Sequence, residues 1–141
     1  MNVTVDELMQ APVMTITKHE TVGHARTLMA DHHVSALPVV GPDGAPLGIV
    51  TATDLLDGHG HPDGAPVSQV MSTSTYTVPR REGPHVAARI MRNHHLHHVV
   101  VVDDHRVVGM VSSFDLLKLV EDHRYVAKGA PTPARQAGGR R

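Results

Sequence analysis

The sequence contains no cysteine and very few aromatic residues, and both absences exclude classes of protein. Without cysteine the chain cannot form a disulfide framework, a zinc ribbon, an iron–sulfur cluster or a thiol nucleophile. Aromatic residues make up 2% of the chain, and they are Tyr76, Phe114 and Tyr125. Any hydrophobic core must therefore be built from Val, Leu, Ile, Met and Ala.

Long apolar runs and an excess of one charge are also missing. No segment approaches the roughly 20 apolar residues that cross a bilayer. The first seven residues show neither the basic nor the apolar region of a signal peptide, so we expect a cytoplasmic protein. Residues 1–126 hold 9 basic and 14 acidic groups, which does not suit a nucleic-acid platform. Residues 127–141 carry 4 basic groups among Pro and Gly and are predicted to form a disordered basic tail.

The chain repeats itself with an offset of 62 residues, which becomes 61 after a turn that is one residue shorter in the second copy. Such self-similarity at a fixed spacing indicates that one structural unit occurs twice. The paired landmarks include Val5 with Val67, Ala25 with Ala87, Met29 with Met91, and residues 47–56 with 108–117.

Each copy predicts the same order of elements, β-α-β-β-α. The fold class is therefore α/β (α+β), with two small sheets. We place the first repeat at residues 1–60, the second at 61–126 and a linker at 57–64. Because a unit of about 60 residues buries little apolar surface alone, the two copies should pack as one body. The expected strands are 14–17, 38–40, 47–51, 76–78, 99–102 and 107–111; helices follow Thr21 and Gly83 and start near Asp54 and Asp115.

Two runs in the first copy carry a resemblance to a known family. Residues 33–40 read His-Val-Ser-Ala-Leu-Pro-Val-Val, and residues 48–56 read Gly-Ile-Val-Thr-Ala-Thr-Asp-Leu-Leu. Their order and spacing resemble a CBS domain, and two in tandem over residues 3–124 resemble a Bateman module. The resemblance implies a pseudo-symmetric regulatory module that binds an adenosine-containing ligand such as AMP, ADP or ATP. The second copy departs from the family pattern at residues 97–100, which bears on its ligand preference.

A Gly-x-x-Thr/Ser-x-x-Asp signature occurs in both copies, ending in Thr51 and Asp54 and in Ser112 and Asp115. A carboxylate at a helix start can accept hydrogen bonds from ribose hydroxyls, and the Thr or Ser hydroxyl can contact a phosphate. The same pattern also caps a helix without any ligand, so both interpretations stay open.

The resemblance implies further binding residues. His97 and His98 stand where nucleotide-binding members of the family place phosphate-contacting side chains, so we expect tighter binding beside Asp115 than beside Asp54. The first-strand positions in the family line the adenine side of the ligand, although simple strand packing is the alternative explanation here. In this chain those positions are Thr15, Ile16, Thr77 and Val78.

The 13 histidines invite a metal interpretation. His94 and His98 would share a face if they lay on one helix, but the helix should end near His95, which breaks that geometry. We therefore predict helix-end positions for these side chains and no specific metal site. No Ser-His-Asp spacing and no Walker-type loop is present, so we predict a binding module and no enzyme.

The expected ligand is an adenine nucleotide, and no cofactor is required. An unidentified effector protein would receive the signal, without membrane or nucleic-acid contact. Because family members often pair, we predict a homodimer formed by the two amphipathic helices, through Val22, Leu28, Met29, Ile90 and Met91. The alternatives are an interaction protein whose clefts stay empty and a histidine-rich metal-binding regulator.

Overall fold

A computed structural model of the chain describes residues 3–56 and 62–122. The expected basic tail, most of the expected linker and the histidines at 59 and 61 lie outside the described residues. Within the described part, no helix has both the length and the apolar character needed to span a bilayer.

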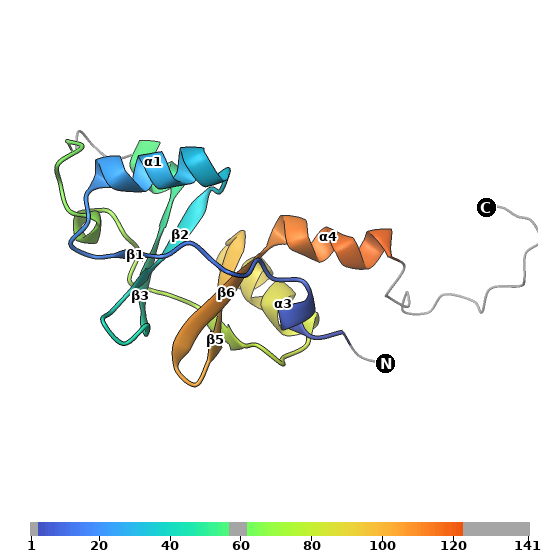
Figure 1. The fold of residues 1–141 in the computed structure, drawn as a ribbon. Coiled ribbons are helices and arrows are strands. Elements are labelled where there is room, and N and C mark those ends of the chain that lie inside the picture. The colour runs from blue at the N-terminus through green and yellow to red at the C-terminus, as the bar shows by residue number, and fades with distance from the viewer. Residues whose placement is uncertain (1–2, 57–61, 123–141) are drawn as a thin grey trace, which may run out of the picture.

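Two three-stranded sheets, one from each repeat, form the body of the protein (Figure 1). In each, the first strand pairs parallel with the second, which pairs antiparallel with the third. The predicted β-α-β-β-α order and the mixed fold class are confirmed. The first repeat comprises β1 (Ile16–Thr17), α1 (Val22–His32), β2 (Ala36–Val40), β3 (Pro46–Thr51) and α2 (Ala52–Leu56). The second comprises β4 (Thr77–Pro79), α3 (Pro84–His94), β5 (His98–Asp103), β6 (Arg106–Ser112) and α4 (Ser113–Glu121). A short 3-10 helix lies near the start of each copy, η1 (Val5–Glu7) in the first and η2 (Val67–Gln69) in the second.

The two long helices begin and end at residues that the sequence identifies. The Thr21 side chain accepts a hydrogen bond from the His24 backbone at the start of α1, and Pro84 occupies the first position of α3. The residue that follows each helix is a histidine with left-handed backbone, His33 with φ 54° and His95 with φ 57°. His95 therefore stands outside the helix, so His94 and His98 do not share a helical face.

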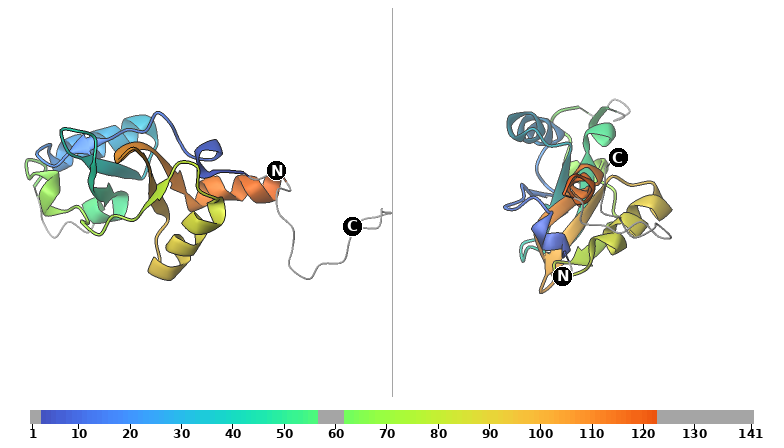
Figure 2. Two further views of the ribbon diagram at one scale, coloured as in Figure 1. Left: turned by 90° about the horizontal axis from the view of Figure 1, so that it is seen from below. Right: turned by 90° about the vertical axis from the view of Figure 1, so that its right-hand side faces the viewer.

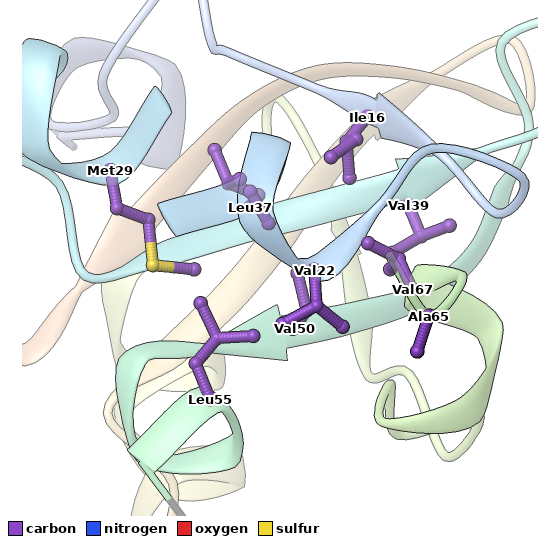
Figure 3. Close-up of a cluster of buried hydrophobic side chains, with 10 residues drawn as sticks. Ile16, Val22, Met29, Leu37, Val39, Val50, Leu55, Ala65 and Val67 are labelled. Atoms are coloured by element: carbon purple, nitrogen blue, oxygen red, sulfur yellow. The ribbon is translucent and has the colours of Figure 1, made fainter. Parts of the chain in front are cut away.

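Each repeat has its own hydrophobic core, and equivalent positions fill both. In the first core, Ile16, Ala25 and Val39 are buried, and their counterparts 62 residues later are buried in the second. Figure 3 shows the first cluster between α1 and the sheet. The buried positions therefore follow the sequence repeat.

A segment preceding the opposite copy completes each core. Val5 and Leu8 are buried among second-repeat side chains, whereas Ala65 and Val67 are buried in the first core. Figure 3 shows Val67 beside Val39, and Figures 1 and 2 show the blue helix η1 beside the second repeat. Backbone hydrogen bonds fix both segments, since Val5 N donates to Glu82 O at 2.8 Å and Val67 N to Glu20 O at 2.7 Å.

The exchanged segments then pair with the third strand of the repeat they enter. Gln10 forms an antiparallel bridge to Met110 on β6, and Ser72 forms the equivalent bridge to Ile49 on β3. A Cβ atom at Gly48 would lie 2.6 Å from Ser72 O. The first glycine of the signature is thus required by the close approach of two backbones.

Three of the five helix residues expected at a dimer interface are buried within the protomer, so the prediction is wrong for these three. Val22, Met29 and Met91 are at most 7% exposed. Leu28 and Ile90 are half-buried and pack against the two cores. The reason is that α1 and α3 direct their apolar stripes toward their own sheets.

We predict that Gly48→Ala destabilises the protein by about 1–3 kcal/mol, because the new methyl group forces the Ser72 backbone away from β3. Gly64→Ala is the matched control, since a Cβ atom at that position would have no neighbour within 4 Å. Urea unfolding monitored by circular dichroism measures both. Equal stability of the two variants would contradict the close-approach explanation.

Candidate functional site

Two cavities are lined by residues of both repeats, and each contains one signature aspartate. The Asp54 cavity has a volume of about 500 Å³, and the Asp115 cavity about 280 Å³. The Asp54 cavity is lined by Ser35, Ile49, Thr51, Ala52, Thr53, Asp54, Ser72, Ser74, Thr75, Tyr76, His95, Leu96, His97, His98 and Val100. The Asp115 cavity is lined by Gln10, His33, Val34, Ser35, His97, His98, Met110, Ser112, Ser113, Phe114 and Asp115.

Asp54 caps helix α2 and also lines the larger cavity. Its Oδ2 accepts a hydrogen bond from Thr51 N at 2.8 Å, and its own N–H donates to Thr51 Oγ1 at 3.2 Å. The capping alternative is therefore realised. Capping uses one carboxylate oxygen, and Oδ1 has no hydrogen-bond partner within the described part of the chain. The half-buried carboxylate can thus cap the helix and still accept a hydrogen bond from a ligand.

Asp115 makes the equivalent cap but is less accessible. Its Oδ2 accepts from Ser112 N at 2.8 Å, and its N–H donates to Ser112 Oγ at 3.0 Å. The residue is 3% exposed, and Lys118 Nζ lies 4.0 Å from Oδ1. Both oxygens therefore already face donors of the protein, which leaves this carboxylate less available to a ligand.

Three residues, Ser35, His97 and His98, line both cavities and form a common wall between them. His98 Nε2 lies 3.3 Å from Ser35 Oγ, and His97 Nδ1 lies 3.4 Å from Ser113 Oγ. Imidazoles therefore line both aspartate cavities, and His97 and His98 give no reason to expect tighter binding beside Asp115 than beside Asp54. The sequence repeat could not show this, because the histidines of one copy reach the cavity of the other.

Burial lowers the pKa of His98, the neighbouring His97 lowers it further, and Asp115 opposes the shift. The neutral imidazole is thus favoured in the unliganded protein. An anion placed in either cavity would favour the imidazolium, because it offsets both the lost hydration and the repulsion by His97.

The four residues expected on the adenine side line neither cavity. Ile16 and Val78 are 1% exposed and belong to the two cores, which agrees with the alternative that these positions serve strand packing. Thr15 and Thr77 also lie outside both linings. Strand β1 therefore contributes no residue to the larger cavity.

The segment at residues 72–76, which the sequence did not identify as part of a site, forms a wall of the Asp54 cavity. Its side chains there are Ser72, Ser74, Thr75 and Tyr76. The Tyr76 ring stacks on His94 with ring centroids 4.1 Å apart. The only sequence signal is a run of hydroxyl residues before a strand, which by itself is typical of a loop.

The described residues contain no group of three or more His, Asp or Glu side chains arranged to hold a metal ion. Histidines do line both cavities, but their ring nitrogens are placed beside hydroxyl groups, as the contacts of His97 and His98 show.

Comparison with known proteins places this geometry in a family. The family model for the CBS domain matches residues 5–59 and 67–122. The uncharacterized protein MJ1404 of Methanocaldococcus jannaschii is 31% identical to this chain over 142 aligned residues. The match covers 89% of this chain and 33% of MJ1404. This chain therefore spans about a third of that relative.

Two solved structures share the fold. The CBS domain pair of protein MJ0100, in complex with 5′-methylthioadenosine and S-adenosyl-L-methionine, has a TM-score of 0.80 and 25% identity, covering 87% of this chain and 99% of that one. Hypoxic Response Protein I with two coordinated zinc ions has a TM-score of 0.75 and 26% identity, covering 82% and 98%. With two family matches and the duplicated fold, the chain belongs to the CBS domain family and forms a CBS domain pair.

Proposed function

We propose that this protein is a regulatory module that binds an adenosine-containing ligand, such as AMP, ADP or ATP, in the Asp54 cavity and signals to an effector protein. The observation that carries the proposal is the Asp54 carboxylate, which lines a cavity shared by both repeats and keeps one oxygen unused by its cap. That oxygen can accept a hydrogen bond from a ribose hydroxyl. The related MJ0100 pair, which binds two adenosine derivatives, supports this ligand class.

The remaining lining provides complementary chemistry for the other parts of such a ligand. His97 and His98 can hold a phosphate as imidazolium groups, while Ile49 and Val100 offer apolar contact for a base. Both imidazoles contact a serine hydroxyl, His98 with Ser35 and His97 with Ser113, but no carboxylate of the described residues forms a hydrogen bond with either ring to complete a catalytic triad. We therefore propose binding without catalysis.

The Asp54 cavity is the better candidate of the two. It has the larger volume, about 500 Å³ against about 280 Å³. Its aspartate is half-buried, whereas Asp115 is 3% exposed and faces Lys118. This order is the reverse of the one expected from the sequence, in which the positions of His97 and His98 favoured tighter binding beside Asp115.

We also propose a homodimer, formed by helix α4. Its buried face packs Leu116 and Leu119 against the second core, while its other face exposes Phe114, Leu117 and Val120 at 77%, 57% and 56%. These three side chains recur every third residue and form one apolar stripe, which is a feature of interaction surfaces. Phe114 also lines the Asp115 cavity, so ligand site and stripe share one helix.

We predict that Asp54→Asn weakens AMP binding about tenfold or more, whereas Asp115→Asn changes it less than threefold. An amide keeps an oxygen for the cap but loses the charged acceptor for the ribose, whose hydrogen bond contributes roughly 1.5–3 kcal/mol. Isothermal titration calorimetry measures the affinities, and thermal melting checks that both variants fold.

The same titration, together with thermal melting in the presence of zinc, distinguishes the proposed function from its alternatives. Loss of binding in Asp115→Asn alone would move the ligand to the smaller cavity. A wild-type protein that binds neither AMP nor 5′-methylthioadenosine would favour an interaction protein with empty clefts, and a shift in melting temperature with zinc alone would favour the metal-binding regulator.

A second prediction concerns pH. Because bound phosphate favours the imidazolium of His98, whose pKa is lowered by burial in the free protein, binding should take up a proton. AMP affinity should therefore rise as pH falls from 8 toward the ordinary histidine pKa of about 6.5. His98→Asn should flatten this dependence, and 5′-methylthioadenosine, which has no phosphate, should bind with little pH dependence. An unchanged slope in His98→Asn would remove His98 from the phosphate site.

A third prediction tests the dimer. The wild-type protein should scatter light as twice its mass of 15.2 kDa, and Leu117→Glu should shift it to a monomer, because the charge would be buried at the interface. Arg89→Glu on the exposed face of α3 is the control and should remain dimeric. A wild-type monomer at tens of micromolar, or a dimer lost only in Arg89→Glu, would contradict the α4 interface.

A further inference from the structure

The outward face of helix α3 carries three exposed basic side chains, His85, Arg89 and Arg92, which form a basic stripe. Because an α-helix turns by about 100° per residue, these three positions lie within about 60° of one another. Ala87 and Met91 lie on the opposite face, where they are buried in the second core. Figure 2 shows α3 in yellow at the edge of the body, with no described helix or strand over its outer side.

No acidic side chain of α3 offsets the charge of the basic stripe. The sequence contains no Asp or Glu between Glu82 and Asp103. Among the residues that the structure describes, neither Arg89 nor Arg92 forms an ion pair. Each guanidinium group can therefore bind a carboxylate of another molecule, with two parallel hydrogen bonds.

The fold does not require these charges, as the first repeat shows. The equivalent positions in α1, 62 residues earlier, are Gly23, Thr27 and Ala30, none of which is charged. The arginine that α1 does carry, Arg26, forms an ion pair with Asp63. Both helices nevertheless bury equivalent residues in their own cores. Since the core forms with and without the basic stripe, the role of the stripe lies outside the folding of the repeat.

The chemistry of the basic stripe indicates an acidic protein segment as its partner. The stripe extends from His85 to Arg92, which is two helical turns or about 10 Å. Carboxylates three and four residues apart on a partner helix match this spacing. Arginine is enriched in protein interfaces. A nucleic acid would instead meet the excess of acidic groups in residues 1–126, 14 against 9 basic groups.

The C-terminal end of α3 lies at the Asp54 cavity. Residues 95–98, which directly follow the helix, line that cavity. The last residue of the helix, His94, stacks its ring on Tyr76, another lining residue, with ring centroids 4.1 Å apart. A ligand in the cavity would thus contact residues that continue from α3, so binding at the cavity and binding at the basic stripe can affect each other.

We propose that the basic stripe of α3 is the surface to which an acidic helical segment of the effector protein binds. The inference rests on the proposed function, which it deepens by naming the chemistry of the effector. Arg89 and Arg92 would each pair with a carboxylate of that segment. Occupancy of the Asp54 cavity would change the affinity for the segment through the end of α3.

The test is fluorescence anisotropy with a labelled helical peptide that carries three Glu residues on one face, at the spacing of the basic stripe. We expect Arg89→Gln/Arg92→Gln to bind this peptide at least tenfold more weakly than wild type. The control Lys18→Gln/Arg106→Gln removes the same charge from exposed positions elsewhere and should bind within about threefold of wild type. Circular dichroism checks that both variants fold, and both should bind AMP as the wild type does.

Reversal of both charges separates a specific contact from general attraction. Arg89→Glu/Arg92→Glu should lose the acidic peptide and bind a peptide in which Lys replaces the three Glu residues. Saturating AMP should change the affinity of the wild-type protein for the acidic peptide at least threefold, because the two binding steps are linked. The same concentration of AMP should leave the peptide affinity of Asp54→Asn unchanged.

Four results would overturn the inference while the proposed function stands. They are no peptide binding by the wild type, wild-type peptide affinity in Arg89→Gln/Arg92→Gln, an equal loss in Lys18→Gln/Arg106→Gln, and a peptide affinity that AMP leaves unchanged. Tighter binding of duplex DNA than of the peptide, dependent on the same two arginines, would also overturn it and make the stripe a nucleic-acid surface.

Failure of the proposed function looks different, because the wild-type protein would then bind neither AMP nor 5′-methylthioadenosine. The loss of peptide binding in Arg89→Gln/Arg92→Gln is measured without any ligand. It would therefore still support an acidic partner on α3 in that event, although not a partner controlled by the Asp54 cavity.

Discussion

The reciprocal exchange of leading segments is the constraint on which the rest of this structure depends. Val5 and Leu8 fill the second core, and Val67 fills the first, so neither repeat has a complete core by itself. Each segment then runs along the third strand of the repeat it enters, past a glycine that leaves room for its backbone. Hydrophobic burial thereby fixes how the two repeats face each other, and the cavities between them follow from that arrangement.

The exchange also explains how one residue type can serve two purposes at the candidate site. The Thr51–Asp54 and Ser112–Asp115 pairs both form caps at the end of a third strand. What distinguishes them is the surface brought opposite by the other repeat. The crossing segment 72–76 faces Asp54 across the larger cavity, whereas Asp115 faces the end of α1 and a lysine on its own helix. Equivalent sequence positions thus acquire different accessibility from non-equivalent neighbours.

Much of the fold could be predicted from the sequence, because it depends on local patterns. Thr21, Pro84 and the Val-rich strands indicate their elements through capping and periodicity. The duplication then requires the second half to fold like the first, and the motifs that resemble the CBS domain indicate the fold of both halves. The signature residues Thr51, Asp54, Ser112 and Asp115 could be located in the same way.

The rest of the site depends on contacts between the copies, which a linear pattern does not contain. The contribution of residues 72–76 to a cavity depends on a crossing between two sheets, and the sharing of His97 and His98 depends on how the repeats meet. The supposed dimer residues illustrate the same limit. An apolar helical stripe does not reveal whether it faces its own sheet or another molecule, and for Met29 and Met91 it faces its own sheet. On α4, Leu116 and Leu119 pack against the core, and the exposed stripe on its other face follows from that packing.

The wall of Ser35, His97 and His98 has a thermodynamic consequence. Because His98 lines both cavities, an anion bound in one of them would change the charge that the other presents to a ligand. Two anionic ligands, one in each cavity, would share the His98 imidazole, and the free energy of protonating it would enter both binding steps but be required only once. Under the proposed function the two cavities would therefore not bind anions independently, and their joint saturation curve would differ from the sum of two separate isotherms.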